Sequence, residues 1–182
     1  MPEGWEGVAD VARPLGLPAM GDFDDLLAAN KRYAISSPGR FDGIAYAGVC
    51  VVMCMDSRLE PLGMMGLFVG EAKILRTPGG HVTPDAEVGC VVGVHLLGVN
   101  RILVIGHTRC AMASGTDEEI AARIRATTGA DASGMTIGAD PDQQGRLRSD
   151  VARLRENPMI AGRAKVGGFM YDVDTGLLTE VA

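Results

Sequence analysis

The hydrophobic pattern of the chain predicts a mainly parallel sheet that is closed by a hairpin. Residues 47–54 are apolar on both faces, which is typical of a central parallel strand covered by helices on either side. Residues 101–106 form a second strand of the buried type, and the short apolar segment 74–75 predicts a strand between these two. Near the C-terminus, residues 166–173 and 177–181 flank a turn and predict an antiparallel hairpin.

Between the strands, apolar residues recur at helical spacing after residues that favour helix N-termini. The expected helices are a segment capped by Asp22 that runs to Tyr33, a short helix from Pro61 through Leu67, a helix from Thr83 to about Leu97, a helix that begins with the capping box of Thr116 and Glu119, and a surface crossover helix over residues 143–156. The predicted fold class is α/β. We expect a three-layer α/β/α arrangement with a mainly parallel four-stranded sheet plus an antiparallel C-terminal edge strand.

Length and composition favour one globular domain. With 182 residues, 47% of them hydrophobic, the chain is long enough for a single substantial core, which we expect over residues 23–182. Residues 1–22 contain three prolines and little periodicity, and they are predicted to be an N-terminal arm. Residues 127–141 are rich in Gly, Ala and Asp and are predicted to be a loop.

Charge and hydropathy argue against two classes of partner. The net charge of -6 disfavours a general nucleic-acid binder, because contacts to phosphates need clustered Lys and Arg. The longest apolar stretch, residues 88–99, is shorter than the roughly 20 residues of a membrane span. The N-terminus lacks a signal-peptide pattern, so we expect a cytoplasmic protein. In that compartment Cys50 and Cys90, which lie inside apolar runs, are predicted to be small buried hydrophobes.

Side chains that can bind a metal follow the two long strands. Cys54 and Asp56 lie at the end of the first strand, and His107 and Cys110 follow the second. Because open α/β sheets place their ligands at the carboxyl ends of the strands, we expect these side chains to converge. Two thiolates and one imidazole suit zinc and are typical of catalytic sites with three protein ligands. Asp56 is either the fourth ligand or is held off the metal by a bidentate pair with Arg58.

With these motifs in view, the sequence resembles the β-class carbonic anhydrases of the short prokaryotic type. The resemblance is carried by C-x-D-S-R at residues 54–58, H-x-x-C at 107–110, the strand and glycine turn at 74–80, and the closing hairpin at 168–176. It extends from about Phe23 to the end of the chain.

The resemblance implies a zinc enzyme with one ion per chain, bound by Cys54, His107 and Cys110 and, in a closed site, by Asp56. The implied reaction is the reversible hydration of carbon dioxide to bicarbonate by zinc-bound hydroxide. Asp56 and Arg58 are the implied catalytic pair, which orients the hydroxide and acts as a gate. The resemblance also implies a homodimer or higher homo-oligomer, with the N-terminal arm packed on a partner subunit.

Two alternatives stay open. In the first, Asp56 permanently closes the fourth position and the chain is a zinc-binding protein without turnover. In the second, the same site hydrolyses a related heterocumulene such as carbon disulfide or carbonyl sulfide. Both need consideration because the family commonly has H-T-D-C-G and R-N-A-G, whereas this chain has Arg109 and Ala111 in the first motif and Thr77-Pro78 in the second.

Two charged or titratable residues beside these motifs have open roles. Arg109 reverses a charge next to the metal ligands and is a candidate to hold an anion. His81 follows the glycine turn and is interpreted as an exposed loop histidine, with a proton relay to buffer as the alternative.

Overall fold

The computed structural model describes residues 21–37, 39 and 42–182. The chain divides between residues 40 and 41 into two compact units, and each unit is described by itself. The first unit contains α1, Asp24–Ile35. The predicted cap at Asp22 is wrong: Phe23 occupies the N-cap position, and the Asp24 carboxylate accepts a hydrogen bond from the Gly21 amide at 2.7 Å. Of the predicted arm, only residues 21 and 22 lie within the described part of the chain.

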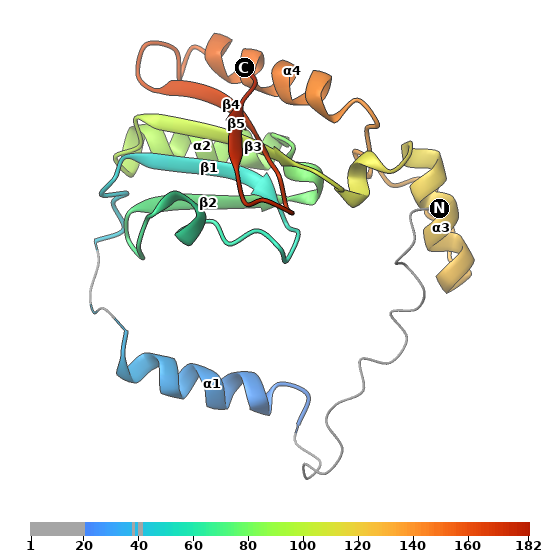
Figure 1. Ribbon diagram of the computed structural model, residues 1–182, viewed down its shortest axis with the longest axis horizontal. Coiled ribbons are helices and arrows are strands. Elements are labelled where there is room, and N and C mark those ends of the chain that lie inside the picture. The colour runs from blue at the N-terminus through green and yellow to red at the C-terminus, as the bar shows by residue number, and fades with distance from the viewer. Residues whose placement is uncertain (1–20, 38, 40–41) are drawn as a thin grey trace. The chain divides into compact units, whose positions relative to one another are not determined.

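The second unit is built on a five-stranded sheet (Figure 1). Its strands are β1 (Val49–Cys54), β2 (Ala72–Thr77), β3 (Arg101–His107), β4 (Lys165–Tyr171) and β5 (Leu178–Glu180). The strands lie in the order β2-β1-β3-β4-β5, with β1 to β4 parallel and β5 antiparallel to β4. The predicted α/β fold, with a mainly parallel four-stranded sheet and an antiparallel C-terminal edge strand, is confirmed.

Helices connect the parallel strands. They are α2 (Pro84–Leu96), α3 (Asp117–Thr128) and α4 (Gln143–Glu156), together with the one-turn 3-10 helices η1 (Gly63–Met65), η2 (Pro78–Gly80) and η3 (Ala111–Ala113). The predicted starts of α2 and α3 are confirmed, because Thr83 accepts a hydrogen bond from the third amide of α2 and both bonds of the Thr116–Glu119 capping box form. The predicted bounds of α4 are confirmed as well.

The predicted helix from Pro61 through Leu67 is wrong. Only the single turn of η1 forms, and Gly66 ends it in the left-handed conformation, with φ 67°. A glycine on each side of two methionines leaves too short a run of helix-favouring residues to propagate beyond one turn.

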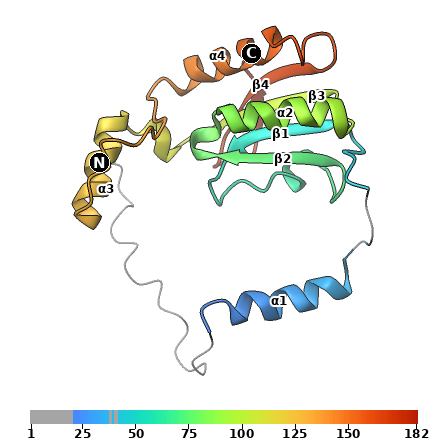
Figure 2. The same cartoon turned by 180° about the vertical axis from the view of Figure 1, so that it is seen from behind.

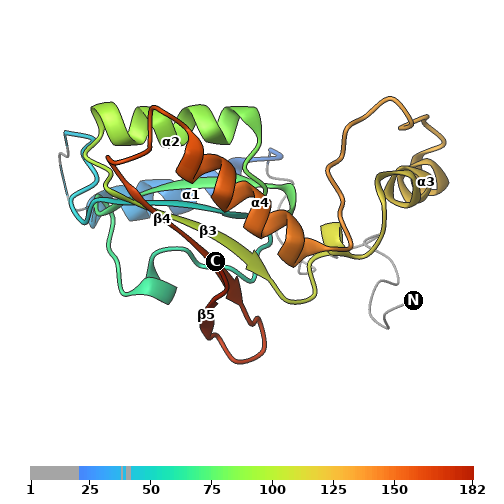
Figure 3. The same cartoon turned by 90° about the horizontal axis from the view of Figure 1, so that it is seen from above.

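The alternation of side chains along β1 divides the core into two clusters, and all six residues of the strand are buried. Cys50 and Val52 belong to the cluster that α2 and α4 complete, which also contains Cys90. Val51 and Met53 belong to the opposite cluster, which the segment after β1 covers. Figure 2 shows α2 lying along the sheet, and Figure 3 shows α2 and α4 on the same side of it. Cys50 and Cys90 are both fully buried, which confirms their prediction as small core residues.

No helix in the described part of the chain is long and apolar enough to span a membrane.

Candidate metal centre

The candidate site lies where β1 and β3 end side by side. Cys54 is the last residue of β1 and His107 the last of β3, and the two parallel strands are in register through Met53 and Ile105. Cys110 follows three residues after His107, just before η3. Because the strands run parallel, their carboxyl ends bring together residues more than fifty positions apart in the sequence.

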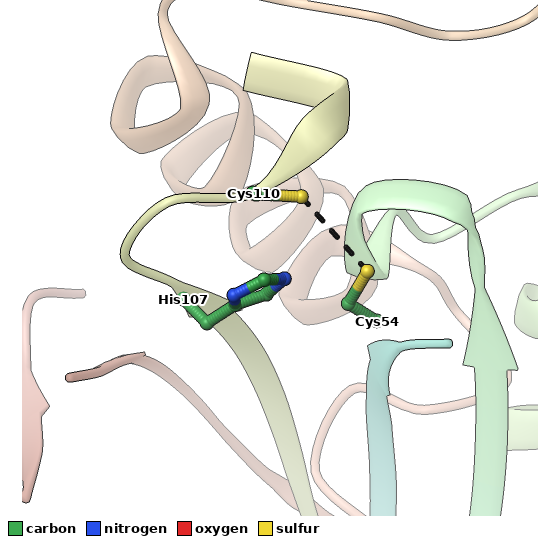
Figure 4. A group of neighbouring side chains, drawn as sticks. All are labelled: Cys54, His107 and Cys110. Carbon is green, nitrogen blue, oxygen red and sulfur yellow. Dashed lines mark hydrogen bonds between the residues drawn. The ribbon is translucent and has the colours of Figure 1, made fainter. Parts of the chain in front are cut away.

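The structure brings Cys54, His107 and Cys110 together, all three buried (Figure 4). One ligand atom from each residue lies within 4.8 Å of the other two, and the two sulfur atoms are 3.9 Å apart. A tetrahedral zinc ion with Zn–S bonds of about 2.3 Å separates its two sulfur ligands by roughly 3.8 Å. The donor set and its spacing therefore fit zinc.

His107 is oriented for this role by its own loop. Its Nδ1 lies 2.9 Å from the carbonyl oxygen of Thr108, an arrangement in which Nδ1–H donates and Nε2 keeps its lone pair. Nε2 is buried and is the one buried side-chain nitrogen or oxygen in the described residues without a hydrogen-bond partner. An orphaned acceptor beside two thiols is the arrangement expected of a metal ligand.

The two thiols differ in proton affinity. The hydrogen bond from Cys110 stabilises the Cys54 thiolate and lowers the pKa of Cys54 to about 4, against the opposing effect of burial. The same contact with the Cys54 thiolate, followed by burial, raises the pKa of Cys110 well above its usual value. In the absence of a cation the pair therefore shares one proton, which a metal must displace to gain both thiolates.

Asp56 and Arg58 form the bidentate pair that their spacing favours. Arg58 Nε donates to Asp56 Oδ1 at 2.9 Å, and Arg58 Nη2 donates to Oδ2 at 2.7 Å. The Arg58 amide also donates to Oδ1, at 3.0 Å. These bonds hold the pKa of the Asp56 carboxyl well below its usual range, so the group is ionised. Oδ2 lies 4.0 Å from His107 Nε2, at the edge of the metal-binding cluster.

Arg76 supports the loop that carries Cys54 and Asp56, and sequence reasoning missed this role. Its Nε donates to the Cys54 carbonyl at 3.0 Å and its Nη2 to the Asp56 carbonyl at 2.6 Å. Arg76 is paired with Met53 across β1 and β2, so the register of the two strands places it there. The residue ranges of the two strands do not by themselves specify this register, so the role of Arg76 could not be inferred from the sequence.

The glycine turn of η2 packs directly against both strand ends. Gly80 has φ 73°, and a Cβ atom there would lie 2.6 Å from the Ile105 carbonyl oxygen and 3.0 Å from the Cys54 amide. Only glycine fits this close approach. The turn therefore fixes the positions of the strand ends that hold the cysteine and histidine.

The interpretation of His81 as an exposed loop residue is wrong. Its exposed fraction is 6%, because the loop at Gly138 and the turn at Gly79 close over the ring. Burial, together with the charge of Arg146, lowers the pKa of His81. Asp150 and Asp140 oppose this effect.

The loop between His107 and Cys110 is bound to the C-terminal hairpin. Arg109 forms an ion pair with Asp174, and the Thr108 hydroxyl accepts a hydrogen bond from the Val173 amide at 3.0 Å. The Arg109 charge, which the sequence offered as a candidate to hold an anion, is thus partnered within the chain. Sequence reasoning missed Thr108 and Asp174, because nothing in the local pattern links them.

A family model described as carbonic anhydrase matches residues 49–178. Beta-carbonic anhydrase 1 of Mycobacterium tuberculosis is 33% identical over 158 residues, which cover 87% of this chain and 96% of the relative. The chain belongs to the β-class carbonic anhydrase family. The predicted resemblance is therefore confirmed, and with it the assignment to a family of zinc enzymes whose general activity is hydration of carbon dioxide.

Two further comparisons bear on the β-carbonic anhydrase fold and its relatives. The crystal structure of carbonic anhydrase from Streptococcus mutans is 32% identical, with a TM-score of 0.81, and the match covers 91% of this chain and 100% of that one. Carbon disulfide hydrolase of Acidithiobacillus thiooxidans is 26% identical over 149 residues, which cover 70% of this chain and 74% of the relative.

Proposed function

We propose that this β-carbonic anhydrase catalyses the reversible, zinc-dependent hydration of carbon dioxide to bicarbonate. The observation that carries the proposal is the buried, unpartnered Nε2 of His107 beside the sulfur atoms of Cys54 and Cys110. One zinc ion per chain would be held by these three residues. When bound, zinc supplies the Lewis acidity that makes hydroxide available near neutral pH.

Asp56 is the proposed hydrogen-bond acceptor for the attacking water. Its carboxylate is ionised and held in place by Arg58 through two side-chain bonds, which also restrain it from becoming a metal ligand. Oδ2 lies 4.0 Å from His107 Nε2, so a water molecule adjacent to the cluster is within reach of that oxygen. Accepting one hydrogen bond from the water leaves its lone pair directed at the carbon of carbon dioxide.

The net charge of the proposed ligand set has a kinetic consequence. Two thiolates cancel the charge of a zinc ion, whereas neutral imidazoles would leave it intact, so the Lewis acidity at this site is moderated. We therefore expect activity to rise with pH above neutrality. A flat profile from about pH 6 to 9 would contradict this ligand set.

We also propose that the protein is a homodimer or a higher homo-oligomer. In support, Val88, Val92 and Leu96 recur every four residues on one face of α2 and are 61%, 37% and 68% exposed. An exposed apolar stripe on a helix that is hydrophobic all round is typical of a face that a second chain covers. Light scattering at micromolar concentration tests this, and a monomeric mass would contradict it.

The test of function is the initial rate of carbon dioxide hydration at pH 8.5, by stopped flow, on protein with measured zinc content. We expect a rate far above background that falls at least about a hundredfold in Asp56→Asn while the zinc content stays at one per chain. The matched control is Asp131→Asn, which changes an exposed loop aspartate.

The other outcomes separate the alternatives. One zinc per chain without hydration, together with sulfide release from carbon disulfide, would assign the activity of the Acidithiobacillus relative. One zinc per chain with neither activity would favour a closed site. In that case Asp56→Asn would lower zinc retention, because Asp56 would be the fourth ligand.

A further inference from the structure

The β4–β5 turn is attached to the loop that carries the metal-ligating residues at three points. The Thr108 amide donates to the Tyr171 carbonyl at 2.9 Å, and the Val173 amide donates to the Thr108 hydroxyl at 3.0 Å. Arg109 Nη2 donates to Asp174 Oδ1 at 2.5 Å. The first contact joins two backbone groups and the second joins a backbone amide to a hydroxyl, whereas the third joins two charges on side chains that are 60% and 63% exposed.

Arg109 also contacts the catalytic pair through its backbone. It is the one non-glycine residue in the described part of the chain with a positive φ, at 55°. In this left-handed conformation its carbonyl oxygen accepts a hydrogen bond from Arg58 Nη2 at 3.1 Å. The same nitrogen donates to Asp56 Oδ2 at 2.7 Å. The two ends of Arg109 therefore connect Asp174 to the guanidinium that holds Asp56.

Arg109 is in contact with both Asp174 and Arg58, through its side chain and its backbone carbonyl respectively. Asp56 holds Arg58 by direct hydrogen bonds, and the charge of Asp174 adds to the effect of Asp56 in raising the pKa of Arg58, as does Cys110. Asp174 is bonded to Arg109, whose carbonyl oxygen accepts a hydrogen bond from Arg58. Removing the positive charge of Arg109 would leave the Asp174 carboxylate without its ion-pair partner, and Arg58, whose side chain is 40% exposed, is the guanidinium in contact with the same residue.

We propose that Arg109 is a positioning residue that occupies Asp174 and so keeps Arg58 on Asp56. This inference rests on the proposed function, in which Asp56 must be held as a hydrogen-bond acceptor beside the metal. If Arg58 turned toward Asp174, the Asp56 carboxylate would lose its side-chain partner. It would then be free to approach the metal ligands, since Oδ2 is already 4.0 Å from His107 Nε2.

The positive charge at position 109, where the family commonly has an acidic residue, is thus matched by Asp174 in this chain. An uncharged residue at this position would leave Asp174 without its partner, and an acidic one would add a further negative charge beside it. In the ion pair Arg109–Asp174 the two opposite charges neutralise each other, so the Asp174 carboxylate does not attract Arg58.

The test compares Arg109→Gln, Asp174→Asn and the double variant. We expect Arg109→Gln to lower the rate of carbon dioxide hydration about tenfold, as loss of a residue supporting the ligands of a metal site does. The double variant should recover to within about threefold of the wild type, because the competing carboxylate is gone. Arg109→Lys, which keeps the charge beside Asp174, should also stay within about threefold.

A second readout does not depend on turnover. In the cobalt-substituted chain, thiocyanate is titrated against the visible absorption spectrum. We expect Arg109→Gln to weaken thiocyanate binding about tenfold, because the released Asp56 competes for the metal, and Asp174→Asn in the same chain to restore it. Zinc content is measured alongside to establish that all variants are loaded.

The pattern of rescue decides the inference. If Arg109 only stiffens the loop through its ion pair, the double variant does not regain that ion pair and will be as impaired as Arg109→Gln or worse, which overturns the proposal. If the wild type does not hydrate carbon dioxide, the proposed function fails. The thiocyanate affinities of the four chains then still test whether Arg109 controls Asp56.

Discussion

Asp150 of α4 accepts a hydrogen bond from the backbone amide of Val82 at 2.9 Å, across 68 positions of sequence. The carboxylate is 3% exposed, and its other oxygen accepts from Arg153 Nη2 at 2.9 Å. Arg153 in turn donates to the Val82 carbonyl and to Glu87. Asp150 and Arg153 therefore bind the amide and the carbonyl of Val82, which lies in the segment that follows the glycine turn.

Asp150→Asn should lower the free energy of unfolding by about 2 kcal/mol, because the buried carboxylate gives up charge-assisted hydrogen bonds to the Val82 amide and to Arg153. The measurement is urea denaturation followed by circular dichroism. Asp142→Asn, at the N-cap of α4, is the matched control and should cost only about 1 kcal/mol or less. Equal effects of the two substitutions would show that Asp150 acts only as an ordinary surface carboxylate.

His81 should make the protein less stable in mild acid. Burial, with Arg146 beside it, lowers the pKa of His81 in the folded state below the ordinary value of 6.5. Above that value the ring is neutral in both states. As the pH falls through 6.5 the unfolded chain takes up a proton that the folded chain does not, so the free energy of unfolding falls until the lowered pKa is reached.

The comparison is the free energy of unfolding at about pH 7.5 and pH 5.5 for the wild type and His81→Gln. The loss on acidification should be smaller in the variant, since it has no buried ring to protonate. His95→Gln, which removes an exposed histidine, serves as the control. An identical pH dependence in wild type and His81→Gln would contradict the expected role of the buried ring.

Arg58→Lys should lower carbon dioxide hydration about tenfold or more, although it preserves the charge. A lysine cannot reproduce the two parallel bonds from Nε and Nη2 to the Asp56 carboxylate. The pKa of Asp56 should also rise toward its usual value, because the side-chain hydrogen bonds from Arg58 are the main cause of its lowering. An unchanged initial rate of hydration in Arg58→Lys, measured by stopped flow, would indicate that Arg58 contributes charge alone.

Zinc should remain at one ion per chain in Cys90→Ser and be lost from Cys110→Ser on dialysis against a chelator. Both thiols are buried. Cys90 lies in the core cluster that α2 and α4 complete, whereas the sulfur atom of Cys110 lies within 4.8 Å of the ligand atoms of His107 and Cys54. Metal content by mass spectrometry distinguishes them. Retention of zinc by Cys110→Ser would remove Cys110 from the ligand set.

The affinity for zinc should also tighten with rising pH. Cys54 raises the pKa of Cys110 in the metal-free pair, so zinc binding must release a proton from that thiol. Competition with a chromophoric chelator at about pH 6.5 and pH 7.5 measures this, after correction for the chelator's own protonation. An affinity independent of pH would mean that Cys110 does not bind as a thiolate.

The spacing of apolar residues was sufficient to predict the elements that place the site. A strand apolar on both faces must be buried on both, and the capping residues Thr83 and Thr116 act on amides three positions away. Strand burial and helix capping depend on residues that are close together in the sequence, so they can be predicted from it. The prediction failed at Asp22, because the neighbouring Asp24 accepts the hydrogen bond from the Gly21 amide, and at Pro61, because Gly63 and Gly66 limit the helix to one turn.

The sequence by itself determined the α/β fold, its strand ends, and the three side chains that meet there, because parallel strands necessarily align their carboxyl ends. Only the tertiary structure decided that Arg76 holds the Cys54 loop, that His81 is buried, and that Arg109 pairs with Asp174. These contacts join segments that are distant in the chain, and they depend on strand register and loop path. Neither the strand register nor the loop path can be predicted from one of the two segments that form the contact.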